Sequence, residues 1–175
     1  PGDARTPCMA NIGFAEKIRL MLAIRWLKAD YILIDLGAGS AFNALDFFAL
    51  SKHGLLVTSP EYPAIMNLLV FLRNFLYRSF DREFKKYPEI QDLLQQFRCI
   101  PAEQGQLTIG NMVQRIGDLL PDAGAKAHAL CQRYQPRVIY NFCLWPEQLE
   151  VCHHLDESSR DLLSMELTHF GSIFE

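Results

Sequence analysis

The chain alternates between segments with a helical spacing of apolar residues and short runs that are almost wholly apolar. Segment 14–28 places Phe14, Ile18, Met21 and Leu22 on one helical face, with its charged side chains, Lys17 among them, mostly elsewhere. Segment 63–87 continues the pattern for longer, with an apolar stripe made of Ile65, Leu68, Leu69, Leu72, Phe75 and Leu76. Further helices are predicted over 43–51, over most of 89–134 with breaks near 101–105 and 121–124, and over 146–165.

Four short runs predict strands, at 31–34, 55–58, 137–140 and 167–174. The first, Tyr31–Ile34, is continuously apolar, which is typical of a strand covered on both faces within a parallel sheet. Because the strands alternate with helices, the predicted fold class is α/β, with a mostly parallel sheet flanked by helices.

Composition narrows the function classes. The 175 residues fit one domain, half of them apolar and 21% charged, which is globular composition. A formal net charge of −3 gives no global basic field to favour nucleic acid. The five cysteines are odd in number and lack paired close spacing, so a reducing, cytoplasmic location is expected instead of a disulfide framework. No apolar run has the length needed to cross a bilayer.

The most informative stretch is DYILIDLGAGSAFN, residues 30–43, in which a predicted strand leads through Asp35 into a glycine turn. Ligands of open α/β sheets bind at the carboxyl ends of strands. There the sequence places Asp35, Gly37, Gly39, Glu61 and Asn141. Such a turn suits either S-adenosylmethionine or a nucleotide with its magnesium ion, and a plain tight turn is the third alternative. The methyltransferase interpretation expects a third glycine where the chain has Ala41.

The residues also resemble a known family. The stretch from Met9 to Arg73 is similar to the middle of MinD/ParA-type P-loop ATPases of the SIMIBI class, most of all the FlhG (YlxH)-like branch that regulates flagellar number and placement. The resemblance rests on DLGAG, then FNALDFF, then a strand ending in TSPE. It runs across nearly the whole chain, with a weak match over 79–135, and includes the two later segments PRVIYNFC and ELTHFGSIF.

That resemblance implies roles for the residues it matches. Asp35 would be the Walker B aspartate, holding Mg²⁺ through water, and Gly37 and Gly39 would form the turn beside the γ-phosphate. Pro60 and Glu61 would lie near the nucleotide or the dimer partner, and Asn141 would hydrogen-bond the adenine. Many relatives carry an arginine after this asparagine, whereas this chain has Phe142.

No G-x-x-x-x-G-K-[ST] loop occurs in the sequence, although the family places it at the amino terminus. Together with the Pro-Gly-Asp start, this predicts that residues 1–175 are the carboxyl-terminal two-thirds of one ATPase domain and do not hydrolyse ATP alone. The implied function is an ATP-dependent switch in spatial regulation, of flagella, cell division or chromosome partitioning. It would be a homodimer with ATP, with a protein partner, a membrane surface or nucleic acid bound by the dimer. A non-enzymatic interaction module is the alternative.

Three other groups of residues carry weaker signals. Asp46 is expected to face solvent from its helix. The basic and aromatic run Arg73–Lys86 is interpreted as a solvated face above an apolar stripe, with binding of nucleic acid, an acidic membrane or a partner as the alternative. Cys143, Cys152, His153 and His154 lack the spacing of a zinc site and are expected to be ordinary core or surface residues.

Overall fold

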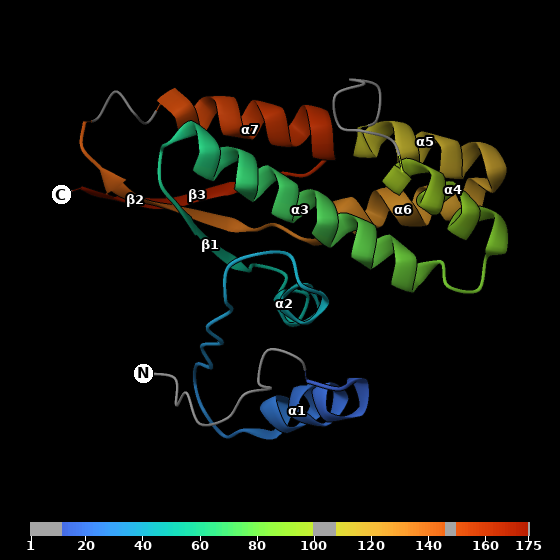
Figure 1. Ribbon diagram of the computed structural model, residues 1–175, viewed down its shortest axis with the longest axis horizontal. Coiled ribbons are helices and arrows are strands. Elements are labelled where there is room, and N and C mark those ends of the chain that lie inside the picture. Colours follow the sequence, from blue (N-terminus) through green and yellow to red (C-terminus); the bar gives the residue numbers. More distant parts are fainter. Residues whose placement is uncertain (1–11, 100–107, 146–149, 175) are drawn as a thin grey trace. The chain divides into compact units, whose positions relative to one another are not determined.

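The computed structural model describes residues 12–99, 108–145 and 150–174 (Figure 1). The chain divides into two compact units, residues 1–50 and 51–175. The first unit contains α1 (Phe14–Trp26) and α2 (Phe42–Phe48). The second contains the sheet and the remaining helices, in the order β1 (Leu55–Thr58), α3 (Tyr62–Glu83), α4 (Pro88–Cys99), α5 (Ile109–Leu119), α6 (Pro121–Arg133), β2 (Arg137–Cys143), α7 (Glu150–Leu163) and β3 (Thr168–Phe174).

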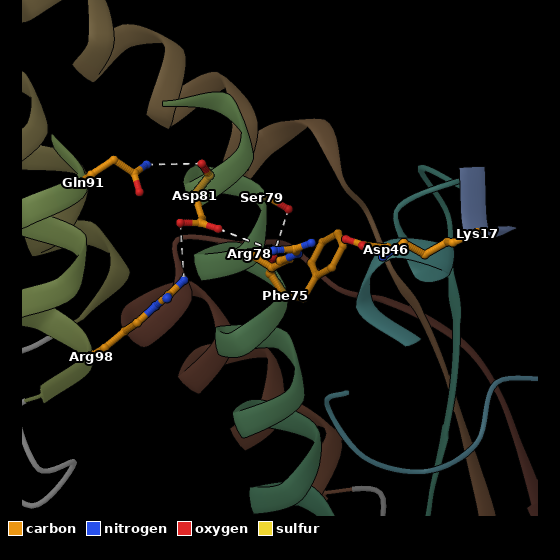
Figure 2. Close-up of polar contacts among 8 residues, drawn as sticks. All are labelled: Lys17, Asp46, Phe75, Arg78, Ser79, Asp81, Gln91 and Arg98. Carbon is orange, nitrogen blue, oxygen red and sulfur yellow. Dashed lines mark hydrogen bonds and ion pairs between the residues drawn. The ribbon is translucent and has the colours of Figure 1, made fainter. Parts of the chain in front are cut away.

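In the first unit, a buried ion pair connects α1 to α2, and the predicted apolar face of α1 is largely exposed. Lys17 is 5% exposed and donates to the carboxylate of Asp46 on α2, which is 3% exposed (Figure 2). Phe14 and Leu22, by contrast, are 74% and 50% exposed. The expectation that Asp46 faces solvent is therefore wrong, and Lys17 is buried although it is not part of the predicted apolar face.

Tyr31–Ile34 is not a strand. The segment has no ladder partner in the described residues, and the side chains of Tyr31 and Leu33 are 90% and 95% exposed. A strand exists only through hydrogen bonds to a neighbour, and an apolar run does not specify which neighbour that is. The expectation of a doubly covered strand before Asp35 is corrected accordingly.

The second unit is built on a parallel sheet in the order β1-β2-β3, as the alternation of strands and helices predicted. Leu55 pairs with Arg137 and Thr58 with Tyr140, so the two strands stay in register over the whole of β1, and β2 continues beyond it to Cys143. Figure 1 shows α3 and α7 lying beside one another along the sheet, and the two helices contact each other. Leu55 and Val57 on β1 are 48% and 62% exposed, while Thr58, one position further along, is buried. The strand therefore buries one of its two faces.

Helix α3 follows its predicted pattern closely. All six residues of its apolar stripe are buried, and Phe75 meets Tyr134 edge to face with the ring centroids 4.7 Å apart. Pro63 stands near the start of the helix, where a missing N–H costs no hydrogen bond. The coarse α/β class is thus confirmed in this unit, and a P-loop ATPase topology stays a prediction.

Helices α5 and α6 approach each other at two glycines. A Cβ built on Gly124 would lie 2.5 Å from the Cα of Gly117. Only Leu120 separates the two helices, so the break expected at 121–124 is a turn of one residue, with Pro121 at the first helical position. The break expected at 101–105 and the start of the helix at 146–149 lie outside the described residues. Within those residues, no helix combines the length and apolar character needed to span a bilayer.

Candidate functional site

The glycine turn lies in the first unit, between α1 and α2. Asp35 is exposed there, in a segment that is neither helix nor strand. Gly39 has φ = 99°, a left-handed conformation that side chains rarely adopt, whereas no such φ applies to Gly37. A Cβ on either glycine would meet nothing within 4 Å. The turn therefore needs glycine for its backbone at Gly39 only, and both positions leave the backbone open to an approaching group.

Pro60, Glu61 and Asn141 lie at one edge of the sheet in the second unit. Thr58, the last residue of β1, pairs with Tyr140, so Asn141 is one position beyond that pair. Pro60 is buried, while Glu61 is exposed at the N-cap of α3, with φ = −90° and no hydrogen bond from its side chain to the helix. The structure thus brings Pro60 and Glu61 to the carboxyl end of β1 and places Asn141 on β2, one position past the last pair with β1. Ligands of parallel sheets bind at this end of the sheet.

The strand that carries Asn141 does not end there. β2 continues to Cys143 through a shift of register between Tyr140 and Cys143. Phe142 lies in that shift with φ = 58°, and its side chain is 57% exposed. A left-handed conformation at a bulky residue costs free energy, and such positions cluster at functional sites. The pattern of apolar residues gave no sign of this bulge, because Phe142 fits an ordinary strand.

The six predicted site residues therefore fall into two sets. Asp35, Gly37 and Gly39 belong to the first unit, and Pro60, Glu61 and Asn141 to the second. The first set is exposed, whereas in the second set Glu61 is exposed, Asn141 is half-buried and Pro60 is buried. That the two sets form one cleft stays a prediction.

The cysteine and histidine group carries no metal site in the described part of the chain. No group of three or more His, Cys, Asp or Glu residues is placed to hold an ion there. Cys143 is buried, with its thiol 3.7 Å from the carbonyl oxygen of Tyr140, and His154 is exposed beside Glu157. The side chains of Cys152 and His153 lie outside the description.

A polar cluster between α3 and α4 was not singled out from the sequence. Figure 2 shows the carboxylate of Asp81 between Arg78, at 3.5 Å, and Arg98 of α4, at 3.8 Å. Gln91 donates from its side chain to the backbone carbonyl of Asp81 at 3.2 Å. The residues on α3 belong to the basic run, but Arg98 and Gln91 come from the next helix, which that run does not indicate.

Known proteins give no further constraint. Comparison of the chain with models of protein families, with curated proteins and with solved structures finds no match. Functional inference therefore rests on the residues themselves and on their placement.

Proposed function

We propose that this chain is the carboxyl-terminal part of a MinD/ParA-like ATPase domain, which works as a nucleotide-dependent switch in the spatial organisation of the cell. One observation supports this proposal above the others. Pro60 and Glu61 follow the carboxyl end of β1, and Asn141 lies on the adjacent parallel strand, one position beyond the last β1–β2 pair. The resemblance assigns these same residues to the nucleotide.

The residues of the glycine turn fit a magnesium nucleotide. Magnesium keeps several waters and takes only one or two protein carboxylates, so the exposed Asp35 suffices without a cage of acidic residues. The left-handed Gly39 and the open space at Gly37 let a backbone approach phosphate oxygens closely. When bound, the metal would neutralise phosphate charge. Asp35 would orient one of its waters, and Asn141 would pair with the base.

In such ATPases the phosphate-binding loop carries the motif G-x-x-x-x-G-K-[ST], which residues 1–175 do not contain. ATP would promote a homodimer that engages a protein partner or a membrane surface, and hydrolysis would release it. The protein to test is therefore the product of the complete reading frame.

Calorimetric titration with ATP and magnesium tests the proposal. Binding is expected at micromolar concentrations, and Asp35→Asn should abolish its dependence on magnesium because the amide cannot replace a carboxylate charge. Asn141→Ala should reduce the preference for ATP over GTP. Asp122→Asn serves as a control because Asp122 is exposed on α6. Absence of nucleotide binding would overturn the proposal, and binding of S-adenosylhomocysteine instead would favour the methyltransferase alternative.

A further inference from the structure

The residue after Asn141 presents an aromatic ring to solvent, toward the end of the sheet where ligands bind. We propose that the ring of Phe142 stacks against the base of a purine nucleotide and so sets the preference for that class of base. The inference rests on the function proposed above and deepens it, because it concerns the same site. Three observations carry it: a bulge in β2, a left-handed backbone and an exposed ring.

Strand β2 has one residue too many at this point. Its register with β3 shifts between Tyr140 and Cys143, and within that shift Asn141 and Phe142 stand opposite Ile173 alone. In a regular strand Phe142 would share the buried face of Tyr140, two positions before it. An extra residue of this kind is a β-bulge, which re-aims a side chain and is over-represented beside active sites.

The backbone of Phe142 holds a conformation that is unfavourable for a bulky side chain. Its φ is 58°, and in the part of the chain that the structure describes Ser164 is the only other non-glycine residue with a positive φ. Such strain persists only where the surrounding structure imposes it. Here Tyr140 and Cys143, which are 1% and 0% exposed, fix the strand on both sides of the bulge.

The strained backbone gives the ring no place in the core. Phe142 is 57% exposed, so packing inside the protein does not offset the free energy that its conformation costs. Strained residues cluster at ligand sites, where the strain holds a group ready for its ligand. An aromatic face that is exposed in this way is a surface on which a planar ring can stack.

The neighbouring side chain makes a nucleobase the ligand that fits. The amide of Asn141 carries both a donor and an acceptor, as the edge of a base does, and it is half-buried one position before the ring. Every base has a π face that can stack on an aromatic side chain. A purine presents two fused rings, so it covers more of the phenyl face than a pyrimidine and should gain more from stacking.

Calorimetric titration of the product of the complete reading frame tests the inference, with the magnesium complexes of ATP, CTP and tripolyphosphate as ligands. Phe142→Ala should weaken ATP binding about tenfold and CTP binding less. Binding of tripolyphosphate, which has no base, should not change. In nuclear Overhauser spectra of the parent protein, the ring protons of adenine should show cross-peaks with those of Phe142.

Variants separate stacking from stability. Phe142→Tyr keeps the ring and should bind ATP as the parent protein does, whereas Phe142→Leu keeps only apolar bulk and should bind as weakly as Phe142→Ala. Phe142→Gly relieves the backbone, so it stays folded, but it should lose the same affinity. Phe170→Ala is the matched control: Phe170 on β3 is also 57% exposed, and its ring lies beside Arg137, at the start of β2.

The possible results distinguish this inference from the proposed function. The stacking of Phe142 is overturned if the parent protein binds ATP and Phe142→Ala or Phe142→Gly binds it as tightly. It is also overturned if tripolyphosphate binding weakens by the same factor, or if Phe170→Ala loses as much affinity for ATP. A parent protein that binds no ATP overturns the proposed function itself, and the inference with it.

Discussion

Replacing Gly124 by alanine should destabilise the protein, although alanine is the better helix former. Gly124 is buried inside α6, where alanine would ordinarily gain about 1 kcal/mol over glycine. The new Cβ would lie 2.5 Å from the Cα and 3.1 Å from the N of Gly117, both backbone atoms. Carbon atoms in contact normally stand about 3.5–4.0 Å apart, so α5 and α6 would have to separate by about 1 Å or more.

That separation has a cost that no rotamer change can avoid. Met112 and Ile116 on α5 are fully buried, as is Ala127 on α6. Overpacking of this kind costs about 1–3 kcal/mol, and rigid backbone on both sides favours the upper part of that range. After the gain in helix propensity, the net loss in free energy of unfolding should be about 1–2 kcal/mol.

Urea denaturation followed by far-ultraviolet circular dichroism measures this loss, which should lower the midpoint by about 0.5–1 M. Gly117→Ala is the matched control, because a Cβ there would lie at an ordinary 3.6 Å from the Cα of Gly124. That variant should be neutral or stabilised by up to about 1 kcal/mol. The reasoning is refuted if Gly124→Ala is as stable as the parent protein, or if both variants lose the same stability.

Three further predictions concern buried charge, ionisation and backbone strain. Lys17→Ala removes the positive charge beside the buried Asp46 carboxylate and should cost about 3–5 kcal/mol, whereas the double variant Lys17→Met, Asp46→Leu should recover most of that loss in urea denaturation. Burial raises the pKa of Cys131 from 9.0 to about 12, so the unfolded chain releases this proton first; stability should fall as pH rises above about 9, and Cys131→Ala should reduce that fall in pH-dependent unfolding experiments. Phe142→Gly should exceed Phe142→Ala in stability by about 1 kcal/mol, since only glycine relieves the left-handed backbone, and equal thermal midpoints would contradict that origin.

The sequence could predict those helices and strands that are defined by the spacing of their own apolar residues. The apolar stripe of α3 is buried as its helical spacing predicts. Strand β1 lies at Leu55–Thr58 as expected, because turn residues flank an apolar run there. The run Tyr31–Ile34 has the same composition as a buried strand but is exposed and unpaired. Composition predicts that a segment can form a strand, whereas pairing depends on which neighbour is available, and no local pattern contains that information.

The polar residues also divide into those whose placement the sequence could predict and those whose placement it could not. Glu61 and Asn141 lie toward the same end of the sheet because β1 and β2 are parallel and in register, so the spacing of the strands along the chain could predict this arrangement. The burial of Lys17 could not be predicted, because it depends on Asp46, 29 residues away, offering an opposite charge. Nor could the pairing of Arg98 with Asp81, since it depends on how α4 packs beside α3. Long-range polar pairs are specified by tertiary packing, which single-sequence patterns do not record.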